Sequence, residues 1–151
     1  MNDRNAPQRR PAANAEPLPH DRSIADYGRD LRSGAFTAQA SIEACLARIE
    51  AERALDAFVH VDADGALATA RAIDLQLAAR VDLGPLMGVP IALKDLYASA
   101  GMPLTAGSRV DIADRVPDEG TLVRTLKRAG AIVIGKTRTT EFAFGTYNPT
   151  H

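Results

Sequence analysis

Two short apolar runs, each bounded by turn residues, place the strongest constraint on how this 151-residue chain can fold. Residues 87–93 have the sequence MGVPIAL and residues 131–134 have the sequence AIVI. Runs of this length with such flanks are typical of buried strands. Between them lie a loop and a predicted helix that begins at Pro117, where acidic residues follow. Strand, helix-containing crossover and strand predict a βαβ unit with parallel strands.

Apolar spacing predicts three more helices upstream of the first strand. The first follows Ser23, which can cap it, and ends at Gly34. The second follows Thr37, which can cap it, and the third covers about residues 64–80. Two strands are few for a complete sheet, which usually has about four to six. We therefore interpret the chain as the N-terminal part of a longer α/β protein.

Details of the remaining elements follow from the same patterns. The helix from Pro117 should bury Leu122, Val123 and Leu126, and residues 140–145 predict a short helical turn. Residues 1–21 contain four prolines and no aromatic residue, so we expect a disordered leader before a single domain over residues 22–151. No export signal is evident, which makes a cytoplasmic location the default expectation.

Composition excludes several classes of function. The net charge of −1 leaves no basic excess for binding phosphates, so we expect no direct nucleic-acid partner. No apolar run approaches about 18 residues, so no membrane span is expected. The single cysteine, Cys45, shares a helix face with Ile42 and is interpreted as a core thiol. The three histidines lack the spacing of metal ligands, and no metal or cofactor is expected.

Residues 130–137, GAIVIGKT, match the G-x-x-x-x-G-K-[ST] pattern of a phosphate-binding loop. Such a loop follows a strand and curls its backbone N–H groups toward phosphate. Here Ala-Ile-Val-Ile favours extended buried structure instead, and a predicted helix precedes Gly130. Nucleotide binding through Lys136 is therefore kept only as an alternative from a different class.

Lys94 is the candidate catalytic residue. Alternation places two sets of residues on opposite faces of the first strand: Val89, Ile91 and Leu93, and Pro90, Ala92 and Lys94. Lys94 directly follows the apolar run, at the carboxyl edge where ligands of open α/β folds bind. With small Ala92 beside it, we expect a partly desolvated ammonium, and desolvation favours the neutral amine that a base requires. A lysine extending into solvent fits the same spacing.

Four blocks of sequence resemble the amidase signature family. They lie in family order across residues 84–151: GPLMGVPIALKD at 84–95, TAGS at 105–108, GAIVIGKT at 130–137 and EFAFG at 141–145. The helical region upstream is compatible with the family. Residues 138–140 depart from the family pattern, which leaves substrate contacts from that segment unassigned.

This resemblance implies an α/β fold with a mixed sheet flanked by helices, present here as an incomplete N-terminal portion. It also implies hydrolysis of a small-molecule carboxamide by a Ser–Ser–Lys triad. The family's base is the lysine that ends Gly-x-Pro-x-x-x-Lys, and it maps onto Lys94. Both triad serines are expected beyond His151, so the chain alone should lack the nucleophile and be inactive.

Three alternatives to a free-standing amidase stay open. The first is the glutamine-hydrolysing component of a tRNA-dependent amidotransferase, which makes ammonia from glutamine, although Leu96-Tyr97-Ala98 favours the free-standing enzyme. The second is the nucleotide-binding loop at residues 130–137. The third is a non-catalytic fragment with exposed helix faces and sheet edges.

Overall fold

A computed structural model describes residues 22–112, 115–116 and 118–145 of the chain. Its described part contains a three-stranded sheet with the order β1–β3–β2, formed by β1 (Phe58–Val61), β2 (Pro90–Lys94) and β3 (Ile132–Thr137). β2 and β3 are parallel, which confirms the predicted βαβ unit, and β1 pairs with β3 in the antiparallel direction. The sheet is therefore mixed, and β2 has a free edge within the described residues.

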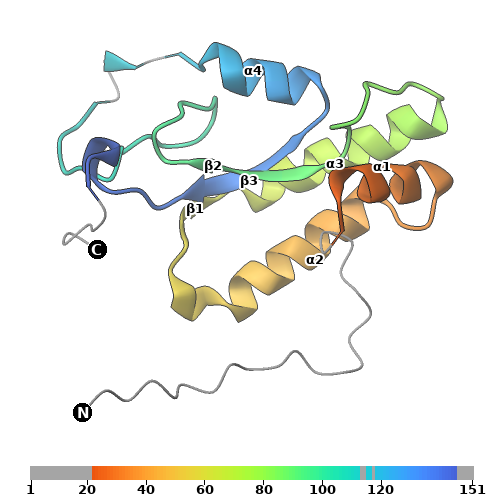
Figure 1. Cartoon of the computed structure of the whole chain (residues 1–151), viewed down its shortest axis with the longest axis horizontal. Helices are drawn as coiled ribbons and strands as arrows, with labels where there is room; N and C mark the ends of the chain where they lie inside the picture. The colour runs from red at the N-terminus through yellow and green to blue at the C-terminus, as the bar shows by residue number, and fades with distance from the viewer. Residues whose placement is uncertain (1–21, 113–114, 117, 146–151) are drawn as a thin grey trace.

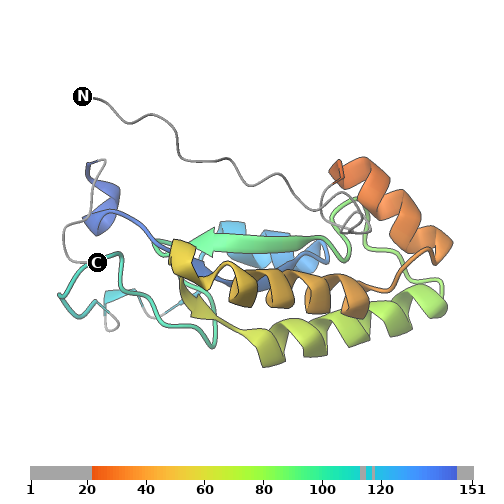
Figure 2. The ribbon, with the colours of Figure 1, turned by 90° about the horizontal axis from the view of Figure 1, so that it is seen from below.

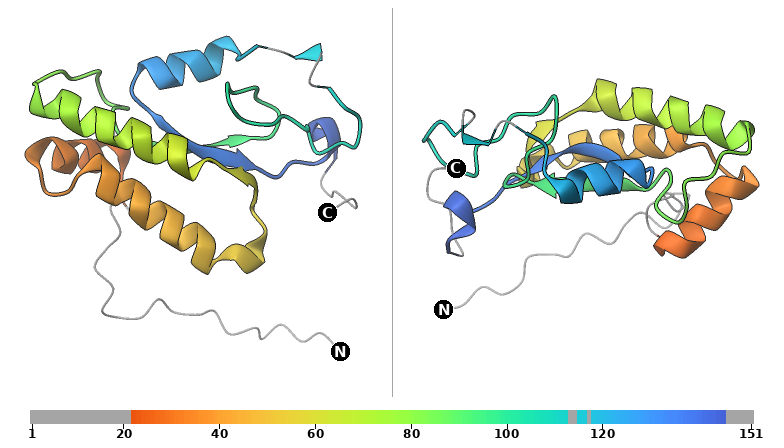
Figure 3. Two further views of the ribbon diagram at one scale, coloured as in Figure 1. Left: turned by 180° about the vertical axis from the view of Figure 1, so that it is seen from behind. Right: turned by 90° about the horizontal axis from the view of Figure 1, so that it is seen from above.

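The helices lie on both sides of this sheet. They are α1 (Ile24–Ser33), α2 (Ala38–Ala51), α3 (Ala63–Ala78) and α4 (Thr121–Arg128). Figures 1 and 3 show α2 and α3 on one side and α4 on the other, and Figure 2 shows α2 and α3 side by side. The predicted leader over residues 1–21, Pro117 and the segment 146–151 lie outside the described residues.

The predicted caps of the first two helices are confirmed. The Ser23 side chain accepts a hydrogen bond from the Asp26 backbone N–H, and Thr37 caps α2 in the same way. Gly34 ends α1 in the left-handed conformation, with φ of 77°. These local signals set where the chain leaves each helix and hence how α1 and α2 turn toward the core.

Two details of the βαβ unit differ from the sequence prediction. α4 begins at Thr121, four residues after Pro117, and Leu122 is 53% exposed, so the prediction that it faces inward was wrong. With a helix of only two turns, a single side chain, Val123, is fully buried against the sheet. β3 also extends beyond the apolar run as far as Thr137, because pairing with β2 and β1 continues there.

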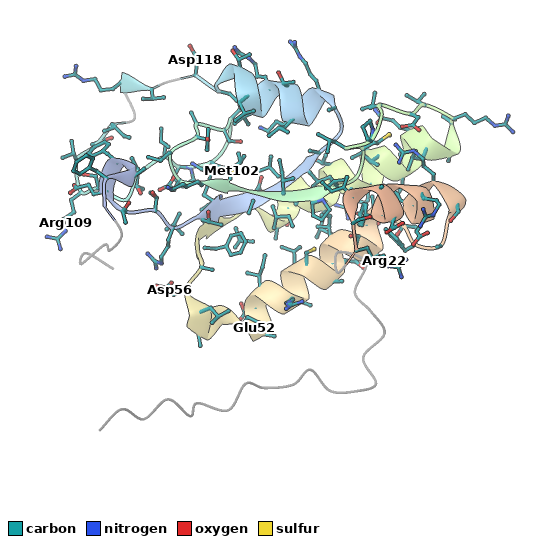
Figure 4. All side chains as sticks on the ribbon, in the orientation of Figure 1. Arg22, Glu52, Asp56, Met102, Arg109 and Asp118 are labelled. Atoms are coloured by element: carbon teal, nitrogen blue, oxygen red, sulfur yellow. The ribbon has the colours of Figure 1, made fainter. Side chains whose placement is uncertain are left out.

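Two groups of buried side chains hold the layers together. The larger lies between the sheet and α1–α3 and includes Tyr27, Ile42, Cys45, Ile73 and Ile132, so Cys45 is a core residue as predicted. The smaller group consists of Leu93, Val123 and Val133, with Met102 packed against it between β2 and α4 (Figure 4). None of the helices in the described part of the chain is long and apolar enough to span a membrane.

Candidate active site

The carboxyl ends of β2 and β3 lie side by side at one edge of the sheet. Lys94, the last residue of β2, pairs with Thr137, the last residue of β3. The segments that follow the two strands lie at this same end of the molecule, as Figure 1 shows for the loop after β2 and for the short turn η3 (Glu141–Ala143). The sequence prediction that Lys94 occupies this edge is confirmed.

The environment of Lys94 differs from the partly desolvated one that was expected. Lys94 and Ala92 are both exposed. Within residues 22–112, 115–116 and 118–145, no hydrogen-bond or ion-pair partner of the Lys94 ammonium is found. The physical reason is that β2 is the edge strand of the described sheet and Lys94 is its last residue.

The predicted alternation holds within β2, where Ile91 contacts the same group as Leu93, but it does not extend to Val89. Val89, just before the strand, packs in the α1–α3 core, whereas Leu93 packs against α4. Ile91 contacts both groups, and the register against β3 shifts after it because Ile134 of β3 is an extra residue between Val133 and Gly135. Since Leu93 faces α4, Ala92 and Lys94 face the opposite side of the sheet.

On that opposite side lies a groove of about 730 Å³ between α2 and the sheet. Its floor is mostly apolar, and the residues that form it include Ile49, Phe58, Ile91, Ala92 and Ile134. Charged residues from the end of α2 and the following turn, among them Glu52 and Asp56, lie along one margin (Figure 4). Lys94 is the next residue after Ala92 on this face, so it stands just beyond the end of the groove.

A buried ion pair lies on the α4 side of the same strand ends. Lys136 in β3 is 0% exposed and Asp95, the residue after Lys94, is 1% exposed. The Lys136 Nζ donates to Asp95 Oδ1 at 2.8 Å and to the Pro103 carbonyl at 3.0 Å. Thr105 donates to the other carboxylate oxygen through Oγ1 at 2.5 Å and through its backbone N–H at 3.2 Å. Both charged groups therefore have hydrogen-bond partners within the protein.

The sequence prediction missed this ion pair. It considered Lys136 only as a phosphate ligand and assigned Asp95 no role. One signal was available: a lysine in a buried strand needs a partner of opposite charge, and a carboxylate stood directly after the neighbouring parallel strand. Because carboxyl ends of parallel strands meet at one edge, Asp95 was the natural candidate.

The structure contradicts the phosphate-loop alternative for residues 130–137. Residues 132–137 form β3 rather than a loop, and the Lys136 ammonium is bound to Asp95. The fold itself requires glycine at both glycine positions of the motif. Gly130 has φ of 84° and lies against Met87, while a Cβ on Gly135 would meet the His60 carbonyl oxygen of β1 at 2.3 Å.

Replacing Gly135 by alanine is therefore expected to lower the free energy of unfolding by about 2–3 kcal/mol, because backbone on the neighbouring strand must move. Urea unfolding followed by circular dichroism measures the effect. Gly120 is the matched control, since a Cβ there meets nothing within 4 Å, and Gly120→Ala should change stability by less than about 1 kcal/mol. Equal losses in both variants would contradict the close approach of β1 and β3.

The loop after β2 is connected to the turn after β3. Ser108 Oγ donates to Glu141 Oε1 at 2.7 Å, and the Phe142 N–H donates to the Ala106 carbonyl at 2.8 Å. Ala106, Phe142 and Ala143 all have positive φ, a conformation that costs energy for residues with a Cβ. Two of the four family-like blocks, at 105–108 and 141–145, thus form one joined wall beside the strand ends.

A partly buried carboxylate, Glu119, attaches the loop after β2 to α4. It accepts hydrogen bonds from Lys127 Nζ and from the Ala100 N–H. Burial raises the pKa of Glu119, but these hydrogen bonds outweigh burial and bring its pKa below the usual value. Glu119 consequently stabilises the folded state above its usual pKa of 4.5, and that contribution is lost as the pH falls through the lower folded-state value.

We expect Glu119→Gln to be about 1 kcal/mol less stable than the unmodified chain at pH 7, with the difference shrinking as the pH falls below about 4. Denaturant unfolding of both proteins between pH 7 and pH 3 measures this difference. The comparison cancels the titration of the other carboxylates. A difference that stays constant or grows toward low pH would contradict the assigned interactions.

Comparison with known proteins assigns the family. The Amidase family model matches residues 40–150, and the chain therefore belongs to this family. Among curated relatives, a glutamyl-tRNA(Gln) amidotransferase subunit of Salinispora arenicola is 43% identical over 136 residues. The protein of the same name from Acidothermus cellulolyticus is 47% identical over 126 residues. These matches cover 85% and 83% of this chain but only 28% and 25% of the relatives.

Solved structures support the same fold assignment. A crystal structure of an amidase matches with a TM-score of 0.77 and 32% identity, over 85% of this chain and 30% of that one. The peptide amidase of Stenotrophomonas maltophilia matches with a TM-score of 0.76 and 34% identity, over 83% and 26%. The fold is thus a portion of the α/β amidase-signature fold, and the chain spans between a quarter and a third of each of these proteins.

Proposed function

We propose that this chain is the N-terminal part of an amidase that hydrolyses a carboxamide C–N bond, with Lys94 as the base. The observation that carries the proposal is the place of Lys94 at the carboxyl end of β2, on the groove side of the sheet and without a partner among the described residues. A lysine side chain that no ion pair holds is available to exchange a proton with a neighbouring hydroxyl group of the enzyme. The buried Lys136, by contrast, is neutralised by Asp95 and is unsuited to that role.

In the Ser–Ser–Lys scheme that the family resemblance implies, the neutral Lys94 amine takes a proton through a bridging serine. The nucleophilic serine then attacks the amide carbonyl, and ammonia or an amine leaves when the Lys94 ammonium returns the proton to the leaving nitrogen through the bridging serine. Water hydrolyses the acyl-enzyme and restores the serine. Desolvation of Lys94 would come from polypeptide that covers the free edge of β2, which is open in the described chain.

A second candidate is hydrolysis of glutamine to supply ammonia within a tRNA-dependent amidotransferase. It is supported by the names of the curated relatives, which are 43% and 47% identical, whereas the two amidase structures are 32% and 34% identical. The two candidates share the base and differ in substrate. Ammonia release from glutamine, compared with release from peptide amides and simple carboxamides, separates them.

The proposal is tested with a chimera in which residues 24–145 replace the matched segment of the Stenotrophomonas maltophilia peptide amidase. The 151-residue chain alone is expected to release no ammonia above the blank, because the family's serines are not assigned to any of its positions. The chimera is expected to hydrolyse an amide. Serine-dependent hydrolysis by the chain alone would overturn the predicted inactivity, and a folded chimera without activity would overturn the proposed function.

A further inference from the structure

Lys94 and Asp95 are neighbours in the chain with opposite environments. Lys94 faces the groove side and is exposed, whereas Asp95 is 1% exposed on the side of α4. Consecutive side chains of a strand point to opposite faces, and this alternation continues from Lys94 to Asp95 where β2 ends. Whatever fixes the Asp95 side chain also fixes the direction in which the Cα–Cβ bond of Lys94 points.

The Asp95 carboxylate is bound by two segments that are far apart in the chain. Lys136 reaches it from β3, and Thr105 reaches it from the loop after β2 through both its hydroxyl and its N–H. The backbone adds a further restraint, since the Asp95 N–H donates to the Thr137 carbonyl at 2.9 Å. The end of β2 is thus anchored on its α4 side by charge-assisted hydrogen bonds, which are stronger than neutral ones.

Lys136 also joins this anchor to the loop. Its Nζ donates to the Pro103 carbonyl in addition to Asp95, so a single buried ammonium connects β3, the end of β2 and the loop that follows β2. The same loop contacts η3 through Ala106. A change in this connection therefore affects the strand end that carries Lys94 together with the wall beside it.

We propose that Asp95, held by Lys136 and Thr105, is the positioning residue that orients Lys94 for proton transfer. This inference rests on the proposed role of Lys94 as the base. Positioning matters because displacement of a reacting group by about 1 Å can cost about 100-fold in rate. Asp95 acts from the opposite face of the sheet and does not touch the reacting atoms.

The first test uses the 151-residue chain and the variant Thr105→Val, which weakens the anchor without leaving a buried charge unpaired. We expect hydrogen exchange of the backbone amides of residues 95–97 to accelerate at least tenfold while amides in α3 keep their rates. Thr69→Val is the matched control, because it removes the hydroxyl that donates to the Gly65 carbonyl within α3. Unchanged exchange at residues 95–97, or an equal acceleration throughout the chain, overturns the inference.

The second test measures kinetics in the amidase chimera. Thr105→Val is expected to lower kcat about tenfold with KM within twofold, and Thr69→Val to change neither. If Thr105→Val fails to fold, the double variant Asp95→Asn with Lys136→Met removes the anchor and both of its charges and takes its place. A loss confined to KM, or an unchanged kcat, overturns the inference. Unchanged turnover in Lys94→Ala overturns the proposed function instead, so the two failures are distinguishable.

Discussion

In the amidase chimera, replacing Lys94 by alanine is expected to lower kcat by about 10²–10⁴-fold, the contribution that a positioned base typically makes. Stability should change little, because Lys94 is exposed and has no partner among the described residues. Steady-state kinetics of ammonia or amine release measure the loss, and thermal unfolding checks that the fold is intact. Near-normal turnover in a folded variant would remove Lys94 from the mechanism.

Lys94→Arg separates the charge of the side chain from its ability to take a proton. Arginine keeps the positive charge but does not become neutral in a protein, so this variant should be as slow as Lys94→Ala. Lys127→Ala is the control for removing a lysine elsewhere, since Lys127 lies on α4 and pairs with Glu119. It should leave turnover within about twofold of the unmodified chimera. Full activity in Lys94→Arg would indicate an electrostatic role instead of proton transfer.

The parts of the fold that sequence predicted well are those whose signals are local. The caps at Ser23 and Thr37 and the buried faces of α2 and α3 depend on residues within a few turns of each other. β1 gave only a weak signal, because it is four residues long and His60 interrupts its apolar residues. Its position depends on Gly135, which admits the His60 backbone at close range.

Long-range pairing explains the other differences. The register between β2 and β3 shifts because the consecutive residues Ile91 and Ala92 pair with Val133 and Gly135, which leaves Ile134 of β3 as the extra residue. Nothing within β2 itself indicates that shift. The exposure of Lys94 likewise depends on which strands neighbour β2, which the local sequence does not encode.

In the candidate site, too, local sequence predicted one feature and distant residues determine the other. The place of Lys94 at a strand end follows from the apolar run before it, and the structure confirms it. The burial of the Lys136 ammonium depends on its hydrogen bonds to Asp95, 41 residues away, and to the Pro103 carbonyl. The motif covers only residues 130–137 and contains neither partner. It therefore suggested a phosphate ligand at Lys136, where the fold has a buried ion pair.

Replacing Lys136 by methionine is expected to lower the free energy of unfolding by about 3–5 kcal/mol. Methionine fills much of the same volume, but it leaves the Asp95 carboxylate buried without its opposite charge. Thr105 continues to donate to the carboxylate, which compensates only in part. Because whole domains are stable by only about 5–15 kcal/mol, a loss of this size is large enough to unfold the chain. Urea unfolding at pH 7, monitored by far-ultraviolet circular dichroism, measures it.

Two further variants show whether the unpaired charge causes that loss. Lys127→Met removes the partner of Glu119 from a more exposed ion pair and should cost about 1 kcal/mol or less. The double variant Asp95→Leu with Lys136→Met removes both buried charges and should recover most of the stability lost in Lys136→Met, because an apolar pair carries no desolvation penalty. If the double variant were as unstable as Lys136→Met, lost packing rather than the buried carboxylate would explain the effect. If Lys136→Met cost no more than Lys127→Met, Lys136 would not be buried against Asp95 in solution.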